Sequence, residues 1–404
     1  MKIKELYSRC DRHLLVILGI LLATGLLLIY SADNSTGNFS HFNRQLIFLG
    51  LGIVLLILSS SSSLSFYSQI SGVFYLMCLI GLVSVKFFGV SSFGAKRWIE
   101  FMGLKAQPSE PAKLAFIIFL ARLLGQLRMD ELGFKSVFIT AAVCIPMAGL
   151  VYIQPDLGTS TIFPAVGMIM LAWAGLPLWF FVMGAIPIIG IFFKPLPWLV
   201  GLGVGLGLIY LWRAGIKWYY MLGVLLLTCG SAILAPQLWD HLKPYQKERI
   251  ISFLNPENDP RRSGYQILQS KVAIGSGGIW GKGYLKGTQT QRRFIPQRHT
   301  DFIFAILGEE LGWVGASGVL FLFYSFLRRG IKIAREAKSG FASLVAIGVV
   351  GLVGYHLLVN VGMATGLLPV TGLPLPFLSY GGSFLLTMMM ATGLLLSVSI
   401  YKQE

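Results

Sequence analysis

The sequence predicts an all-α polytopic membrane protein, and three observations lead to this fold class. Of the 404 residues, 55% are hydrophobic and only 12% are charged, against roughly 25% charged residues in a typical soluble domain. The mean hydropathy is +0.72. Apolar runs of about 20 residues, the length that crosses a bilayer as a helix, recur from one end of the chain to the other. We therefore expect a single integral membrane domain over residues 1–404.

Twelve apolar stretches are expected to form the transmembrane helices. They are 13–31, 45–60, 66–88, 111–126, 136–153, 159–175, 178–193, 197–212, 218–235, 301–325, 341–362 and 382–400. Gly and Pro are frequent in 159–235, so a pair of those segments could be re-entrant instead. Basic residues at the N-terminus and near 122–135, 213–217 and 328–338 agree with an even number of spans and both termini in the cytoplasm. The first stretch is expected to remain as a signal-anchor.

The same topology places two polar segments outside the membrane, 89–110 and 236–300. The large extracytoplasmic loop, 236–300, carries eleven Lys and Arg against four Asp and Glu, a net charge of +7. A basic surface on the outer side predicts an anionic partner such as a phosphate or pyrophosphate headgroup, an anionic lipid or an acidic polymer. Contact with anionic lipid alone is the simpler alternative. Nucleic acid is not expected as a partner on this side.

Ionisable residues at the membrane boundary are candidates for a functional site, because burying them there is costly. Glu110 and Lys113 open the fourth stretch in QPSEPAK, three residues apart, so they can pair on one helix face. The alternative is a simple capped helix start with Ser109 or Glu110 as the cap. Asp156, in QPDLGT, fits either a site or a helix N-cap. Asp259 lies before a proline and two arginines, and these four ionisable residues can converge on one outward cavity.

Several further features allow two interpretations. Residues 264–291 combine the start of an amphipathic helix with a glycine-rich run whose spacing is not that of a P-loop, so a flexible loop is favoured over phosphate binding. His299 is a candidate general acid or base, or an interfacial structural histidine, and Asp301 is expected to start the next helix. One of Glu309 and Glu310 is expected to face the protein interior. The scattered cysteines predict packing positions, with no disulfide framework and no metal site.

Five segments carry a resemblance to the SEDS family, named for shape, elongation, division and sporulation. They are GAKRWIEFMGLKAQPSEPAKLA (94–115), QPDLGTS (154–160), DPRRSGYQILQSKVAIGSGGIWGKGYLKGTQTQ (259–291), IPQRHTDFIFAILGEELGWVG (295–315) and NVGMATGLLPVTGLPLPFLSYGGS (360–383). GTQTQ followed by RHTDF is more similar to the rod-shape branch than to the division branch. The family has about ten spans, so the resemblance implies a SEDS-type helix bundle of about 10–12 spans, with the excess in 176–235.

The resemblance implies a peptidoglycan glycosyltransferase that polymerises lipid II into β-1,4 glycan strands for lateral wall elongation. The reaction would invert the anomeric carbon and release undecaprenyl pyrophosphate at the periplasmic face of a bacterial inner membrane. It implies Asp259 as general base, or as ligand of a divalent cation such as Mg or Mn. Basic side chains would neutralise the leaving pyrophosphate. The substrate-binding residues so implied are Arg97, Glu110, Lys113, Asp156, Arg261, Gln269, Ser270, Lys271, His299 and Ser379.

The implied partners are the nascent glycan strand, a class B penicillin-binding protein that crosslinks strands, and other membrane proteins of the elongation complex. No organic cofactor is expected. A lipid II flippase and a scaffold without chemistry are the alternatives, although a transporter should show internal repeats or paired interrupted helices. The sequence departs from the family in two motif positions. Asn255 stands where many relatives have Asp, which leaves Asp259 as the only carboxylate of that pair, and Gln297 stands where Glu is common.

Overall fold

The computed structural model describes residues 11–92, 95–101, 104–128, 132–190, 197–241, 246–247, 251–253 and 263–401. Nine helices in this part of the chain are long and apolar enough to cross a membrane, which confirms a multi-pass membrane protein. They are α2 (Arg12–Asn34), α3 (Ser40–Ser61), α4 (Leu64–Phe88), α6 (Phe134–Ile153), α7 (Leu157–Ala174), α10 (Trp218–His241), α14 (Ile303–Glu336), α15 (Gly340–Thr365) and α16 (Gly382–Ile400).

The other three predicted stretches also form helices, but shorter ones. They are α5 (Ser109–Leu124, 16 residues), α8 (Leu178–Gly190, 13 residues) and α9 (Pro197–Arg213, 17 residues). At a rise of about 1.5 Å per residue, helices of this length fall short of the roughly 30 Å hydrocarbon core unless flanking residues extend them. Helices α8 and α9 lie within 159–235, the region for which the sequence left a re-entrant pair open.

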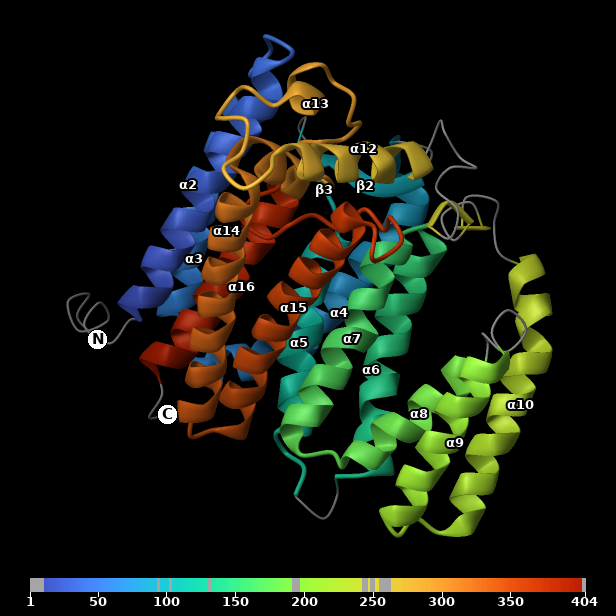
Figure 1. Ribbon diagram of the computed structural model, residues 1–404. Coiled ribbons are helices and arrows are strands. Elements are labelled where there is room, and N and C mark those ends of the chain that lie inside the picture. The colour runs from blue at the N-terminus through green and yellow to red at the C-terminus, as the bar shows by residue number, and fades with distance from the viewer. Residues whose placement is uncertain are drawn as a thin grey trace.

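Elements that do not span the membrane cover one end of the bundle (Figure 1). They are a small antiparallel sheet of order β1-β2-β3, formed by β1 (Val90–Ser92), β2 (Ala95–Phe101) and β3 (Leu104–Ala106), and two helices, α12 (Ser263–Ser276) and α13 (Thr288–Gln291). Helix α12 lies across α14 and α15. The sheet was not predicted from the sequence. The amphipathic start of 264–291 is confirmed as α12.

The apolar core is divided into two clusters. The main bundle, defined here as α2–α7 and α14–α16, shares one large buried cluster. A second, small cluster of Ile186, Leu211 and Val224 holds α8, α9 and α10 together. These three helices stand beside the main bundle in Figure 1. Ring contacts of Phe134 with Phe180 (5.0 Å) and with Tyr220 (5.7 Å) attach them to α6.

Two predicted helix starts and one helix length differ from the structure. Helix α5 has Pro108 at its N-cap, without a side-chain cap, so neither Ser109 nor Glu110 caps it. Helix α14 starts at Ile303, just after Asp301, and runs 34 residues to Glu336, well past the predicted end at 325. The apolar pattern ends at 325, but basic residues are good helix formers and continue the helix where it leaves the membrane. A kink interrupts α14 at Gly312, where φ is 65°.

A buried non-helical loop, residues 366–381, connects α15 to α16. Four of its apolar side chains are almost fully buried, Leu373, Leu375, Phe377 and Leu378, whereas Leu367 near its start is exposed. Its backbone passes so close to α2 that a Cβ at Gly25 would overlap Phe377 O. Irregular backbone at membrane depth is tolerated only where protein or a polar cavity satisfies its polar groups. Here Asn360 Nδ2 donates to Leu373 O at 2.8 Å.

Candidate functional site

The first group of candidate residues is a buried ion pair at the start of α5. Lys113 Nζ lies 2.7 Å from Glu110 Oε2, and the two side chains are 1% and 6% exposed. The predicted pairing on one helix face is therefore confirmed. The angles of this contact are not those of a hydrogen bond, and Glu110 Oε2 and Ser109 Oγ are buried without a hydrogen-bond partner among the described residues. The carboxylate is nonetheless paired with the ammonium, so the two buried charges offset each other.

A histidine that the sequence analysis did not select completes this group. His356 in α15 is fully buried, and its Nε2 lies 3.5 Å from Lys113 Nζ. Its Nδ1 lies 3.1 Å from Pro374 O in the 366–381 loop. A carbonyl oxygen only accepts, so Nδ1 carries the proton and Nε2 presents its lone pair to the ammonium. A histidine within an apolar stretch was the signal that could have revealed this residue.

An aromatic ring closes one side of the group. Lys113 Nζ lies 5.3 Å from the centroid of the Phe384 ring, within the range of a cation–π contact. The rings of His356 and Phe384 are 4.9 Å apart. Three helices, α5, α15 and α16, therefore surround one ammonium group in a medium with little water, where its electrostatic interactions are strong.

A second pair, Arg97 and Asp156, lies over the connection between α6 and α7. Arg97 Nη1 is 3.6 Å from Asp156 Oδ1, and the guanidinium also donates to the carbonyls of Gln154 and Pro155. Asp156 Oδ1 accepts from Thr159 N at 3.2 Å, so the predicted N-cap is confirmed. Gln107 connects the two pairs, because its side chain donates to Asp156 Oδ2 and its carbonyl accepts from the N–H of Glu110.

Helix α12 brings three of the candidates to the end of α15. Ser270 Oγ donates to Ala364 O at 2.7 Å. Lys271 is exposed and lies against Gly366, the left-handed residue that ends α15. A cation at a helix C-terminus is stabilised by the helix dipole, so Lys271 has a structural role available as well as a substrate role. Gln269 is half-buried on the same helix.

Ser379 and His299 belong to a clasp that joins three segments. Ser379 Oγ donates to Thr300 O at 2.6 Å and accepts from Leu375 N, while Tyr380 N donates to His299 O. The His299 ring stacks on His41 with centroids 4.2 Å apart. Burial, with the nearby His41 acting in the same direction, lowers the pKa of His299 to about 4. A histidine with this pKa is neutral at pH 7 and is a poor general base there.

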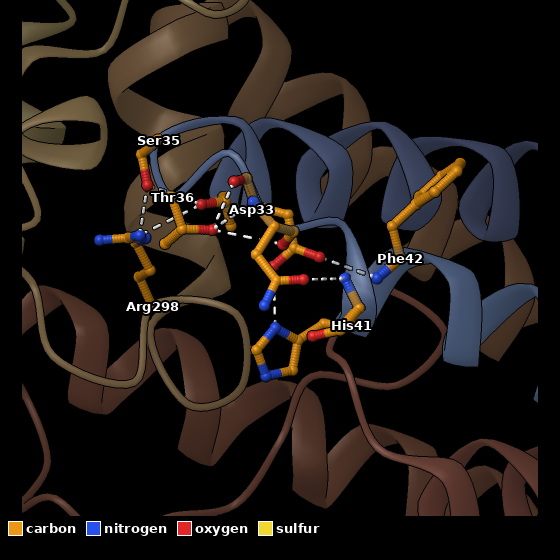
Figure 2. A network of polar contacts seen from close by, with 9 residues as sticks. Asp33, Ser35, Thr36, His41, Phe42 and Arg298 are labelled. Carbon is orange, nitrogen blue, oxygen red and sulfur yellow. Dashed lines mark hydrogen bonds and ion pairs between the residues drawn. The ribbon is translucent and has the colours of Figure 1, made fainter.

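Figure 2 shows the polar contacts on the other side of this clasp, at the end of α2. Asp33 Oδ1 lies 2.8 Å from His41 Nδ1, and Asp33 Oδ2 accepts from Phe42 N at 2.9 Å. Arg298 donates to Ala32 O and to Ser35 Oγ. A cavity of about 270 Å³ lies among Asp33, His41, Arg298, His299 and their neighbours. The arginine donates to one carbonyl and one hydroxyl at the C-terminus of α2, which is a structural role.

The glycine-rich run binds α14 and does not form a phosphate loop. Four backbone hydrogen bonds join it to the kinked part of α14: Lys282 N to Glu309 O, Gly283 N to Glu310 O, Trp313 N to Gly278 O and Val314 N to Ile279 O. A Cβ at Gly277 or Gly281 would overlap the α14 backbone. The glycines therefore permit close approach of two backbones, and the flexible-loop interpretation was wrong.

Glu309 and Glu310 are both buried, at 0% and 1% exposure, whereas only one was expected to face inward. Glu309 accepts five hydrogen bonds, from Lys282 Nζ, Thr288 Oγ1, Gln289 N, Thr290 N and Thr290 Oγ1. Two of these are backbone donors at the start of α13, so the carboxylate acts as its cap. Glu310 Oε1 accepts from Ser31 Oγ at 2.5 Å. The two carboxylates thus hold the 277–291 segment to the bundle.

Two of the predicted site residues, Asp259 and Arg261, lie outside the described residues. Within the described ranges, no group of three or more His, Cys, Asp or Glu is arranged to hold a metal ion. Cys78 and Cys144 are buried thiols, as predicted, whereas Cys229 is exposed on α10.

Comparison with known proteins identifies the class of protein. The family model described as "Cell cycle protein" and named for FtsW, RodA and SpoVE matches residues 11–204 and 200–404. The chain therefore belongs to the FtsW/RodA/SpoVE family of membrane proteins, as the SEDS resemblance implied.

Three similar proteins are each matched over almost their whole length. Peptidoglycan glycosyltransferase MrdB of Escherichia coli K12 is 34% identical, covering 97% of this chain and 94% of that protein. Peptidoglycan glycosyltransferase RodA of Treponema pallidum is 35% identical, with 97% and 98% covered. Stage V sporulation protein E of Bacillus subtilis is 37% identical, also with 97% and 98% covered.

Two solved structures share the fold. One, described as "Structural coordination of polymerization and crosslinking by a peptidoglycan synthase complex", has a TM-score of 0.73 at 28% identity, with 98% of this chain and 99% of that chain covered. The crystal structure of RodA from Thermus thermophilus has a TM-score of 0.64 at 25% identity, with 98% of each chain covered. The all-α polytopic fold class is therefore confirmed.

Proposed function

We propose that this chain is a peptidoglycan glycosyltransferase that polymerises lipid II into β-1,4 glycan strands for lateral elongation of the cell wall. Full-length similarity to MrdB and RodA supports this activity. One observation of the structure also supports it: Lys113 and Glu110 form a buried ion pair, with His356 beside the ammonium. Ionisable residues buried at a membrane helix end are costly and are therefore candidates for a functional site.

The proposed reaction is a direct inverting transfer. A sugar 4-hydroxyl attacks the anomeric carbon of the donor, and the bond from that carbon to the pyrophosphate oxygen breaks. Asp259 accepts the hydroxyl proton as general base, and no covalent enzyme intermediate is needed. Cationic side chains offset the charge that develops on the undecaprenyl pyrophosphate. For this role we propose Lys113 first, and Arg97, Arg261 and Lys271 as further candidates.

We propose that the remaining substrate-binding candidates position other residues or form the walls of the site. Glu110 holds Lys113, and Asp156 holds Arg97. Ser270, His299 and Ser379 direct their contacts to the backbone or rings of the protein itself, so they would shape the walls of the site. Gln269 shares α12 with Ser270 and would face the substrate.

A divalent cation, Mg or Mn, is part of the proposal only at Asp259. Since the described residues offer no cluster of metal ligands, such an ion would depend on Asp259 and on oxygens of the pyrophosphate. When bound, it would supply positive charge to the leaving group. No organic cofactor is proposed.

The proposed partners are the nascent glycan strand, a class B penicillin-binding protein and other elongation-complex membrane proteins. The structural likeness to a chain of a peptidoglycan synthase complex that couples polymerization and crosslinking supports the transpeptidase as partner. A nucleic-acid partner is not proposed.

We further propose that the protein lies in a bacterial inner membrane with both termini in the cytoplasm and the site facing the periplasm. The basic segments around 122–135 and 328–338 support this orientation. Reporter fusions at residues 215 and 195 are expected to report the cytoplasm and the periplasm respectively. The reverse pattern would overturn the topology.

The test of function is glycan formation from purified lipid II, with the partner transpeptidase present and with or without divalent cation. Wild-type protein is expected to polymerise, whereas folded Asp259→Asn and Asp259→Ala variants that still bind lipid II are expected not to. Polymerisation by both variants at the wild-type rate would remove Asp259 from the mechanism. If the wild-type protein makes no glycan, the flippase and scaffold alternatives would be favoured over the enzyme.

A further inference from the structure

The side chain of His356 has no assigned part in the reaction, yet it contacts the centre of the proposed site. It comes from α15, whereas Glu110 and Lys113 come from α5. It is fully buried, so its two ring nitrogens have only protein atoms around them. A buried polar group is retained only when its hydrogen bonds are satisfied, and here both nitrogens have a neighbour.

The two nitrogens of His356 act in opposite directions. Nδ1 donates to Pro374 O in the buried 366–381 loop, at 3.1 Å. This donation fixes the tautomer, and Nε2 is then an acceptor facing Lys113 Nζ at 3.5 Å. The ring is thus oriented by a backbone carbonyl and offers its lone pair to the ammonium.

The Lys113 ammonium has three N–H donors. One faces His356 Nε2, the Glu110 carboxylate lies on another side, and no further acceptor contacts Nζ among the described residues. The ring of Phe384 covers a further side. Lysine is a flexible point charge with several rotatable bonds, so these neighbours decide where the remaining donor points.

We propose that His356 is a positioning residue that orients the Lys113 ammonium toward the substrate pyrophosphate and couples it to the 366–381 loop. This inference rests on the proposed function, since it assigns Lys113 a substrate oxygen. Its consequence is a rate effect: misplacing a catalytic group by about 1 Å can cost on the order of 100-fold in rate. The loop contact means that a shift of the 366–381 backbone would reach Lys113 through one imidazole ring.

The experiment compares variants of the full chain in lipid II polymerisation. His356→Phe and His356→Met both remove the two ring nitrogens, but the replacing side chains differ in shape. If one variant fails to fold because of poor packing, the other can still be measured. His356→Gln keeps an acceptor and a donor. We expect kcat to fall about 10- to 100-fold in His356→Phe and His356→Met, with KM changed less than about threefold. In His356→Gln, kcat should recover largely. Thr392→Val, at a buried hydroxyl that bonds only within α16, is the matched control.

A double-variant cycle separates positioning from packing. Lys113→Arg keeps the cation but changes its geometry, so it should retain measurable activity. If His356 acts through Lys113, His356→Phe should cost less than about twofold in the Lys113→Arg background. An equal loss in both backgrounds, matched by an equal loss of Tm, would make His356 a packing residue and overturn the proposal.

The outcomes also distinguish this inference from the proposed function. If wild-type protein polymerises lipid II and a folded nitrogen-free His356 variant does so at the same rate, the positioning role is wrong and the function stands. If wild-type protein makes no glycan with its partner present, the function itself fails.

Discussion

Helix α16 and helix α10 have nearly the same mean hydropathy, but they occupy different surroundings. In α16, 83% of the residues in the most apolar window are buried inside the protein, whereas in α10 only 11% are. The first belongs to the main bundle that encloses Lys113, and the second belongs to the α8–α10 group with its small separate core. Hydropathy therefore identifies a membrane span but not its neighbours, because lipid and protein interior are equally apolar.

The largest expected effect comes from removing the charge at the centre of the main bundle. Lys113→Met leaves Glu110 buried and unpaired, which should cost about 3–5 kcal/mol of folding stability and abolish polymerisation. The measurement is thermal unfolding together with glycan formation. Adding Glu110→Gln should restore much of the stability and none of the activity. Lys217→Met, beside the α8–α10 group, is the control and should change neither quantity.

A methyl group added to a helix glycine tests packing in the two regions. In α16, a Cβ at Gly393 would overlap Ser59 Oγ and Leu56 O of α3, so Gly393→Ala should destabilise by about 1–3 kcal/mol. In α10, no atom lies within 4 Å of a Cβ at Gly230. Gly230→Ala should be neutral or stabilising by up to about 1 kcal/mol. Equal effects in thermal unfolding would contradict the division into two regions.

The clasp at the end of the main bundle should make stability depend on pH. Burial lowers the pKa of His299 to about 4, below its ordinary value of 6.5. Between these two values the unfolded state binds the proton and the folded state does not, so stability falls as pH drops from about 6.5 toward 4. The slope should reach about 1.4 kcal/mol per pH unit. His299→Gln should flatten this part of the Tm profile, and an unchanged profile would contradict the assignment.

The smallest effect is expected from removing α8 and α9. Their deletion takes out a pair of helices, which preserves the direction of α10, and a short Gly-Ser linker can join α7 to α10. The exposed side of α10 would face lipid, at little cost in free energy. Polymerisation should remain within about threefold of wild type. A complete loss in folded protein would show that this group contributes to the site.

Much of the fold was predictable because each helix follows from a local apolar run. Each of the twelve predicted stretches contains a helix among the described residues, and the pairing of Glu110 with Lys113 follows from a spacing of three residues. The N-cap at Asp156 is equally local. These features depend on neighbours in the sequence, which is what a sequence pattern can report.

The rest depends on contacts between distant segments. His356 reaches Lys113 across 243 residues, and no periodicity reports such a pair. The glycine run packs against the kink of α14 through backbone contacts between the two segments. Its composition is typical of a flexible loop, which is why the sequence favoured that interpretation. The inward-facing 366–381 loop has apolar composition without helical structure. The loop is surrounded by α2 and α15, and the residues of the loop alone do not indicate that these helices are its neighbours.

The contact between Gly25 and the 377–378 backbone joins a helix made early in synthesis to a loop made near its end. During insertion, the face of α2 around Gly25 lacks this backbone neighbour until residues 377–378 have been synthesised. Closure of the bundle is then a late event of long sequence separation, which slows folding. Chains released before residue 377 would expose this face to chaperones and membrane proteases, and quality control could recognise incomplete molecules there.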